Sequence, residues 1–439
     1  MWGSDVDHVR ALIERHFAGS GNTLRMGGIP VTDLASEYGT PLFLYDAGIL
    51  DRQLALLRST YPPEFAIAYS IKANPCPPIV RHFVEAGLGL EVASGGEFYQ
   101  TLQAGCPAER ILFAGPGKTE AELAYVLERG IGEIHVESER EAERLAAIAK
   151  RLGVRAHVAL RINPGPDAQG GAMRMGGKPA PFGVDEERID PVIDRLERSP
   201  DIEFQGIHLF TGTQILDDTV LLTQYRKGLE IARRVVERIG RPLRTIDFGG
   251  GLGIPYFTSE APLPMNKLKE GLAVLGAEVR ADAAFGGTRL LIEPGRYLAG
   301  EAGIYLARVN DVKESRGKTF LIVDGGMNHH LAASGNLGQV IKRNFPVAIA
   351  NRLEEAAGPP VDIVGPLCTP LDVLARDVPL PPAQVGDLVA IFQSGAYGRT
   401  ASPLGFLSQP SPAEVFVRDG KASLARRRGT YEDGLRDAP

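Results

Sequence analysis

Strand-length apolar runs that alternate with helix-length charged stretches most constrain the fold of this 439-residue chain. Six such runs lie between residues 41 and 300, at 65–70, 134–137, 157–162, 204–210, 245–248 and 290–292. Residues 120–129, 139–151 and 222–239 between them have the apolar spacing of amphipathic helices. Repeated β–α units place helices outside a parallel sheet, and about eight of them close into a barrel. We therefore predict an α/β fold with a (β/α)8 TIM barrel over residues 41–300.

The pattern changes after residue 300. Residues 303–312 and 318–324 flank a Glu-Ser-Arg-Gly turn, which is typical of an antiparallel hairpin, and residues 386–393 and 413–418 read as further strands. We predict a C-terminal, mostly antiparallel β domain over residues 301–439, with residues 1–40 joined to it as an N-terminal extension. Residues 6–17 could form a helix there. The Arg426-Arg427-Arg428 run is interpreted as a solvated tail rather than a docking patch.

The charge balance favours a small-molecule ligand. Lys and Arg number 48 against 54 Asp and Glu, a net charge of −6 that argues against nucleic acid or an anionic membrane as the main partner. Three scattered cysteines are too few for a disulfide framework or a zinc site, so no metal is predicted. No apolar run approaches about 18 residues, and the first twenty residues are rich in charge. We expect a cytoplasmic protein.

The first of four chemical motifs ends the apolar run at 65–70. Residues 69–75 read Tyr-Ser-Ile-Lys-Ala-Asn-Pro, which places Lys72 at the carboxyl end of a predicted barrel strand. A lysine that is partly desolvated there has a lowered pKa and can form a Schiff base. Taken alone, a lysine at a strand end is more often an ordinary surface residue.

The other three motifs offer groups that bind phosphate. Residues 247–253 (Asp-Phe-Gly-Gly-Gly-Leu-Gly) lead a strand into a glycine cluster whose backbone can cradle a phosphate. Residues 292–296 (Ile-Glu-Pro-Gly-Arg) supply a guanidinium fork for phosphate and a carboxylate that could hold a protonated heterocyclic nitrogen. Residues 395–398 (Gly-Ala-Tyr-Gly) add a hydroxyl. A tight turn and a simple ion pair remain open as alternatives for the first two.

The order of these motifs, with His208 and a Gly-Pro-Leu-Cys segment at 365–368, resembles the fold-type III pyridoxal-phosphate decarboxylases. This group contains the ornithine, diaminopimelate and arginine decarboxylases, and the resemblance runs from about residue 41 to 417. It implies an alanine-racemase-like architecture, a pyridoxal 5'-phosphate cofactor and a homodimer whose active sites are shared between subunits. It also implies the activity of an amino acid decarboxylase, which is a lyase of biosynthesis.

The resemblance assigns a role to each matching position. Lys72 corresponds to the lysine that forms the Schiff base with the cofactor, His208 to the imidazole stacked against the pyridine ring, and Glu293 to the partner of the ring nitrogen. Cys368 resembles the loop cysteine that the neighbouring subunit presents to handle the proton at the substrate Cα. The phosphate-binding set comprises Gly249, Gly250, Gly251, Arg296 and Tyr397.

The sequence departs from the family around the substrate. The segment from His208 to Gln214 is two residues longer than the family's His-hydrophobe-Gly-Ser-Gln, so we take Thr213 as the phosphate-side hydroxyl. Thr369 follows Cys368 where the family has an acidic residue for a distal ammonium group. After the Asp-Gly-Gly-Met-Asn segment at 324–328, two adjacent histidines and Ala332 stand where diaminopimelate decarboxylases carry an arginine and a tyrosine. A glycine- and methionine-rich loop spans 170–177.

These departures resemble the decarboxylases associated with exosortase gene clusters and the glutamyl-carrier-protein decarboxylase of aminoglycoside side-chain biosynthesis. The resemblance implies decarboxylation of the α-carboxylate of an L-amino acid whose side chain is acylated or linked to a carrier protein, such as a glutamyl thioester. Two alternatives stay open: a diaminopimelate decarboxylase with an unusual pocket, and a non-catalytic homologue that binds the cofactor or a partner protein.

Overall fold

The computed structural model describes residues 5–17, 19–165, 173–174 and 179–438. These residues divide into two compact units. The barrel unit holds residues 54–254 and 262–297. The β unit holds residues 255–261, the chain up to residue 53 and the chain from residue 298 onward. Among the described residues, no helix combines the length and the apolar character needed to cross a membrane.

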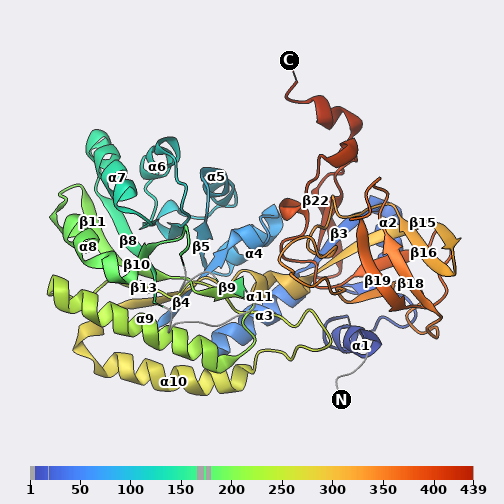
Figure 1. Cartoon of the computed structure of the whole chain (residues 1–439), viewed down its shortest axis with the longest axis horizontal. Coiled ribbons are helices and arrows are strands. Elements are labelled where there is room, and N and C mark those ends of the chain that lie inside the picture. The colour runs from blue at the N-terminus through green and yellow to red at the C-terminus, as the bar shows by residue number, and fades with distance from the viewer. Residues whose placement is uncertain (1–4, 18, 166–172, 175–178, 439) are drawn as a thin grey trace. The chain divides into compact units, whose positions relative to one another are not determined.

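Eight parallel strands close into a barrel in the barrel unit (Figure 1). In chain order they are β4 (Phe65–Ser70), β5 (Gly89–Val92), β6 (Ile111–Phe113), β7 (Glu133–Val136), β8 (Ala156–Asn163), β11 (Ile202–Leu209), β13 (Thr245–Asp247) and β14 (Arg289–Ile292). The barrel closes because β14 pairs with β4 and β7 pairs with β8. This confirms the predicted barrel, and β4 has the predicted bounds. The expected runs omitted β5 and β6, which have four and three residues.

The remaining elements of the barrel unit are helices and three short strands. The helices are α3 (Ala47–Thr60), which begins in the β unit, α4 (Pro77–Glu85), α5 (Gly95–Gln103), α6 (Glu120–Leu127), α7 (Glu139–Leu152), α8 (Ile189–Arg198), α9 (Asp218–Ile239), α10 (Met265–Ala281) and α11 (Arg296–Ala299), which ends in the β unit. Strand β10 (Val184–Asp185) pairs with β8, and β9 (Met173–Arg174) pairs with β12 (Gly212–Thr213).

Local sequence signals set the ends of these helices. At the start of α6, the Thr119 hydroxyl accepts a hydrogen bond from the Glu122 amide at 3.2 Å, and the Glu122 carboxylate accepts one from the Thr119 amide at 3.0 Å. This capping box satisfies two amides that the helix leaves without partners. Gly153 ends α7 at φ 66° and Gly240 ends α9 at φ 71°, a left-handed conformation that costs glycine little.

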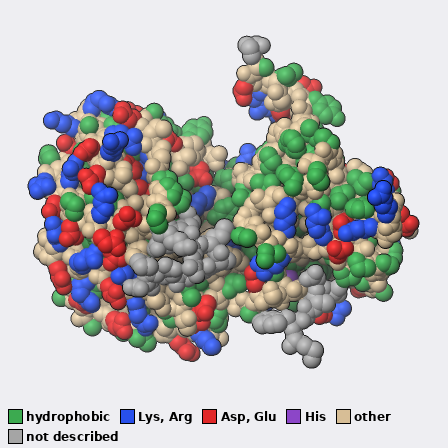
Figure 2. All heavy atoms as spheres, viewed as in Figure 1, with side chains coloured by type: hydrophobic (Ala, Val, Ile, Leu, Met, Phe, Trp, Pro, Cys, Tyr) green, Lys and Arg blue, Asp and Glu red, His purple; other side chains and the backbone are tan. Residues whose placement is uncertain are grey.

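The barrel helices expose both signs of charge. Figure 2 shows Lys and Arg side chains interspersed with Asp and Glu over this face of the barrel unit. Ion pairs link neighbouring helices, with Arg195 on α8 at 3.7 Å from Glu139 on α7. Mixed charge of this kind makes no basic stripe for a polyanion on the face shown, in line with the net charge of −6.

A small apolar cluster fills the barrel. Ala68 on β4, Leu112 on β6 and Leu291 on β14 pack together, with Ala66 against them. Because β6 pairs with neither β4 nor β14, this contact runs across the barrel interior. The polar residues of the candidate site lie beyond this cluster, toward the carboxyl ends of the strands.

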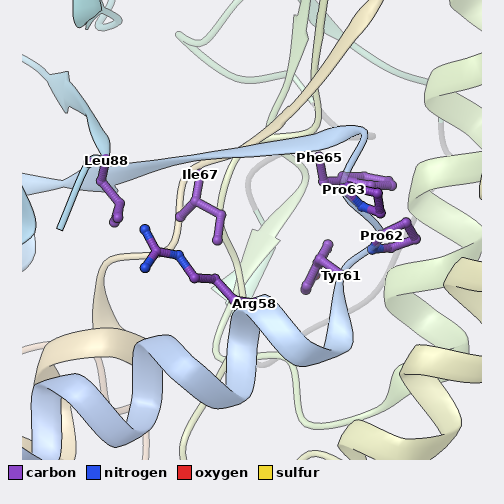
Figure 3. A pocket seen from close by; sticks show the side chains of 8 residues that line it. Arg58, Tyr61, Pro62, Pro63, Phe65, Ile67 and Leu88 are labelled. Carbon is purple, nitrogen blue, oxygen red and sulfur yellow. The ribbon is translucent and has the colours of Figure 1, made fainter.

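A pocket of about 240 Å³ lies at the amino-terminal end of β4, the opposite end from Lys72 (Figure 3). Tyr61, Pro62 and Phe65 line one side of it, and Arg58 and Leu88 line the other. The Arg58 guanidinium donates to the Ala86 carbonyl at 2.5 Å, so it braces the loop after α4. Because this pocket lies at the start of β4 and Lys72 lies after its end, the pocket is not part of the predicted active site.

The β unit is built on a mostly antiparallel sheet with the strand order β19-β18-β16-β15-β3-β21-β22. These strands are β3 (Leu42–Asp46), β15 (Gly303–Ser315), β16 (Lys318–Val323), β18 (Pro360–Val364), β19 (Val373–Pro379), β21 (Ala413–Arg418) and β22 (Lys421–Arg426). Off this path, β20 (Leu388–Ile391) pairs with β15 and with β17 (Val347–Ile349). The unit also contains α1 (Asp5–His16), β1 (Arg25–Met26), β2 (Ile29–Pro30) and α2 (Val31–Tyr38). The predicted class of the second domain is confirmed.

Two sequence-based assignments differ from the structure. The predicted division placed residues 41–53 in the barrel, whereas they group with the β unit because β3 pairs with β15 and β21. The arginine run is only in part a solvated tail: Arg426 pairs with Glu414 at 2.6 Å, whereas Arg427 is 53% exposed and pairs with Asp433 of the same terminal segment at 2.7 Å. The Arg428 guanidinium donates to the Pro41 carbonyl at 2.8 Å, so the run ties the end of the chain to its beginning.

His329 and His330 are buried structural residues rather than a metal pair. His330 accepts from the Ala333 amide at 3.3 Å and bonds the Ser394 hydroxyl at 2.9 Å. His329 bonds the Pro410 carbonyl at 3.1 Å through Nε2. Burial lowers the pKa of His330 to about 3 and that of His329 to about 4, so both imidazoles are neutral at pH 7.

His330→Gln should make the protein less sensitive to acid. The folded protein keeps this imidazole neutral down to about pH 3, whereas the unfolded chain protonates it below about pH 6.5. The unfolded state therefore binds more protons in this window, and stability falls as the pH falls, by up to about 1.4 kcal/mol per pH unit for one histidine. Urea midpoints measured from pH 4 to 7 should show the gap between wild type and variant narrowing toward low pH. A constant gap for His330→Gln would contradict the assignment.

Candidate active site

Three of the predicted motifs meet where β4, β13 and β14 end. A Cβ on Gly295 would lie 2.9 Å from the Ala73 Cβ and 3.1 Å from the Ser70 carbonyl oxygen, so the turn after β14 packs on the turn that carries Lys72. The Ser70 amide donates to the Pro294 carbonyl at 3.3 Å. A Cβ on Gly250 would lie 2.5 Å from the Glu293 carbonyl oxygen. The structure thus brings the lysine, glycine and Glu-Pro-Gly-Arg motifs into one place.

Lys72 lies in a short 3₁₀ turn, Ile71–Ala73, directly after β4. Its Nζ is 2.9 and 3.1 Å from the two carboxylate oxygens of Glu91 on β5, which is fully buried. The Ser70 hydroxyl donates to the same carboxylate. The Lys72 side chain is 42% exposed, so the amine is held in place on one side and accessible to solvent on another.

The glycine cluster can be made only of glycine. Gly249 has φ 67° and Gly251 has φ 106°, backbone conformations that other residues rarely adopt. A Cβ on Gly249 would lie 2.6 Å from the Leu209 carbonyl oxygen, and one on Gly251 would lie 2.9 Å from the Gly212 carbonyl oxygen. The backbone after β13 therefore runs directly along the segment that follows β11. This segment includes half-buried Thr213.

Four buried titratable side chains lie together inside the barrel. One ligand atom from each of His135, His208, Asp247 and Glu293 lies within 4.8 Å of those of the others. His208 Nε2 is 3.5 Å from Glu293 Oε2, and the His208 and His135 rings are 4.4 Å apart. His135 Nε2 is 3.8 Å from Asp247 Oδ2. Glu293 Oε1 has no hydrogen-bond partner among the described residues.

The charges in this cluster are unequal. Burial lowers the pKa of His208 to about 4, so its imidazole is neutral at pH 7. Burial, and then the charge on Glu293, raise the pKa of Asp247 well above its ordinary value. Burial alone would raise the pKa of Glu293 as well, but contact with His208 outweighs it and the pKa lies below its ordinary value. The pKa values of the two carboxyl groups, Asp247 and Glu293, are therefore shifted in opposite directions.

Two ring side chains at the end of β11 have different surroundings. His208 is 1% exposed and packs on His135, so the structure places it beside Glu293 rather than on an open face. Phe210 is half-buried, and its ring would be 2.9 Å from a Cβ on Gly249. Stacking of His208 on the cofactor ring stays a prediction, and Phe210 is an aromatic side chain at the glycine cluster that sequence reasoning missed.

Cys368 and Tyr397 belong to the β unit. Tyr397 has φ 53° and Gln393 has φ 55°, so two non-glycine residues in one loop adopt a strained conformation of the kind that clusters at functional sites. A Cβ on Gly395 between them would collide with the Ala299 carbonyl oxygen. Cys368 is exposed, whereas Cys76 and Cys106 are buried. The predicted loop at 170–177 lies, apart from residues 173–174, outside the described residues.

Sequence reasoning missed three of the buried polar groups at the site. Glu91, His135 and Asp247 lie on short strands that are almost entirely buried. A charged or imidazole side chain in a barrel strand indicates a functional site. The inside of a barrel holds few side chains, and a buried polar group is costly unless it has a partner or a function. Such a residue in the sequence indicates which face of the strand is functional, but it does not show which side chains from other strands lie beside it.

Comparison with known proteins places the chain in a family. The family described as "Pyridoxal-dependent decarboxylase, pyridoxal binding domain" matches residues 48–300. The chain belongs to this family. It is an amino acid decarboxylase, a lyase, and its cofactor is pyridoxal 5'-phosphate. The family match agrees with the sequence-based resemblance and removes the non-catalytic alternative.

Individual relatives of this decarboxylase differ in substrate. The chain is 39% identical over 406 residues to the L-glutamyl-[BtrI acyl-carrier protein] decarboxylase of Niallia circulans. The aligned region covers 92% of this chain and 94% of that protein. It is 35% identical over 427 residues to the diaminopimelate decarboxylase of Zymomonas mobilis, covering 96% and 98%. The solved diaminopimelate decarboxylase of M. jannaschii superposes with a TM-score of 0.87 at 27% identity, covering 95% and 96%.

The residues present fit this cofactor. The glycine cluster is packed so closely that a Cβ on Gly249, Gly250 or Gly251 would meet a backbone carbonyl oxygen, and a glycine turn of this kind after a strand offers the backbone amides that a phosphate cradle uses. Glu293 offers a buried carboxylate oxygen that has no other partner among the described residues, as a protonated ring nitrogen requires. Lys72 offers an amine on a side chain that is 42% exposed, so an aldehyde group can reach it.

Gly250→Ala should weaken cofactor binding by at least about tenfold. Its Cβ would meet the Glu293 carbonyl oxygen at 2.5 Å, and overpacking of this kind costs about 1–3 kcal/mol. Titration of the cofactor-free protein with pyridoxal phosphate, followed by absorbance, measures the affinity. Gly117→Ala is the matched control, because no atom lies within 4 Å of its Cβ position. Equal affinity in Gly250→Ala and wild type would contradict the cradle.

Proposed function

We propose that this decarboxylase removes the α-carboxylate of an L-amino acid whose side chain is acylated or linked to a carrier protein, as in a glutamyl thioester. The observation that carries the proposal is the loop at residues 365–372. Its one acidic residue, Asp372, is 3% exposed and accepts hydrogen bonds from two backbone amides. Thr369 stands directly after Cys368, so this loop exposes no carboxylate to a distal ammonium group.

The similarity to a glutamyl-carrier decarboxylase at 39% identity supports this substrate class. Diaminopimelate decarboxylation remains a second candidate, because several relatives with that activity cover more than nine-tenths of the chain. The two candidates differ at the far end of the substrate and share the same chemistry at Cα.

The proposed roles follow from the placement of the side chains. Lys72 would hold the cofactor covalently, with Glu91 orienting its amine. Gly249, Gly250, Gly251, Thr213, Arg296 and Tyr397 would hold the phosphate. When bound, pyridoxal phosphate supplies an electron sink for the pair left behind as CO₂ departs. Glu293 keeps a negative charge in a water-poor site, where it stabilises a proton on a ring nitrogen. Cys368, which we predict is presented by the neighbouring subunit of a homodimer, returns a proton to Cα.

Glu293→Gln should lower turnover by about 10²-fold or more, which is the usual effect of removing one preorganised electrostatic group. Cofactor should be retained, because its phosphate is held by other residues. Asp247→Asn is the matched comparison: burial and the charge on Glu293 hold the pKa of Asp247 well above its ordinary value, so a neutral amide of the same shape should cost far less. Steady-state rates and the absorbance of the bound cofactor check both variants. Equal losses in the two variants would contradict the assignment of the charge to Glu293.

A side-by-side assay tests the substrate class. We expect kcat/KM for a carrier-linked glutamyl substrate to exceed that for free diaminopimelate, ornithine, arginine or glutamate by at least about 10²-fold, since a pocket without a partner for a distal charge gains nothing from that charge. CO₂ release at matched concentrations is the measurement. If free diaminopimelate gives the higher value, the second candidate stands.

A further inference from the structure

Asp372 joins two loops of the β unit through its carboxylate. Its Oδ1 accepts a hydrogen bond from the Met327 amide at 2.6 Å, and its Oδ2 accepts one from the Leu367 amide at 2.9 Å. Met327 lies in the turn after β16, and Leu367 lies in the loop between β18 and β19. One buried side chain therefore holds two segments that are forty residues apart in the sequence.

The backbone is shaped to receive this carboxylate. A Cβ on Gly326 or on Gly365 would collide with the Asp372 oxygens, so glycine at both positions lets the two loops close on the side chain. Among the described residues, no lysine, arginine or histidine forms an ion pair with Asp372. Two amides alone compensate its burial, which is costly unless both hydrogen bonds form. Its contribution is therefore to the geometry of the loop rather than to charge pairing.

The loop held in this way carries Cys368. The Asp372 amide donates to the Thr369 carbonyl at 3.2 Å, and the Gly365 amide donates to the Asp372 carbonyl at 3.1 Å. Together with the bond from Leu367, these contacts fix the backbone on both sides of Cys368, while the thiol itself stays exposed. We propose that Asp372 is a positioning residue that fixes Cys368 for its reaction; this inference rests on the role proposed for Cys368 in the decarboxylation.

Cysteine alkylation tests the proposal independently of activity. Cys368 is the one exposed cysteine of three, so iodoacetamide followed by mass spectrometry reports its rate selectively. In the holoenzyme, Asp372→Asn replaces one acceptor oxygen by a donor that faces a backbone amide. We expect alkylation of Cys368 at least about threefold faster than in wild type, and kcat at least about tenfold lower with KM little changed. Asp377→Asn, at an exposed position on the same strand β19, should leave both unchanged. An unchanged or slower alkylation rate would overturn the proposal.

A second measurement, made on the wild-type protein, tests the inference even if Asp372→Asn fails to fold. Hydrogen exchange of wild-type holoenzyme should show the Met327 and Leu367 amides protected to the same degree as the amides within β18, and fast exchange at both would overturn the inference. Comparison with Cys368→Ala separates the positioning role of Asp372 from the catalytic role proposed for Cys368. If Asp372→Asn speeds alkylation while Cys368→Ala keeps full turnover, Asp372 positions the loop as inferred and the catalytic role proposed for Cys368 is the part that fails.

Discussion

Close backbone packing between the turns at the strand ends is the constraint on which the site depends. Gly250 lets the turn after β13 contact the Glu293 carbonyl, and Gly295 lets the turn after β14 contact the turn that carries Lys72. With a Cβ at either glycine, one of these turns would have to move. The glycines therefore set the distances between a lysine, a carboxylate and a phosphate cradle that come from separate parts of the sequence.

The same close packing explains the buried charges. A barrel of eight strands has room inside for few side chains, and at this level several of them are ionisable. Two carboxylates this close cannot both ionise at low cost. The pKa of Asp247 is raised and that of Glu293, next to His208, is lowered, so the proton is favoured on Asp247 and the negative charge on Glu293. Among the described residues, the ion-pair partner of Glu293 is His208, at 3.5 Å.

Close packing of loops also occurs in the β unit. The buried Asp372 carboxylate accepts hydrogen bonds from the Met327 and Leu367 amides and so joins two loops of this unit. One residue thus bears on both the geometry of the loop around Cys368 and the charge that this loop exposes. Strained φ values at Gln393 and Tyr397 show that another loop of this unit is also held against its local preference.

The sequence by itself determined the architecture and the main motifs. Alternating apolar runs and the spacing of amphipathic helices predicted the barrel, and the hairpin around residues 314–317 predicted the change to a β-rich unit, because these signals are local. Lys72, Glu293 and the glycines were found because their motifs are contiguous. Only the tertiary structure decided that β3 belongs to the β unit, that Arg426 and Arg428 bind residues of this unit, and that Asp247 and His135 lie beside Glu293. Each of these depends on which strands become neighbours, and pairing between distant segments leaves no periodic trace in the sequence.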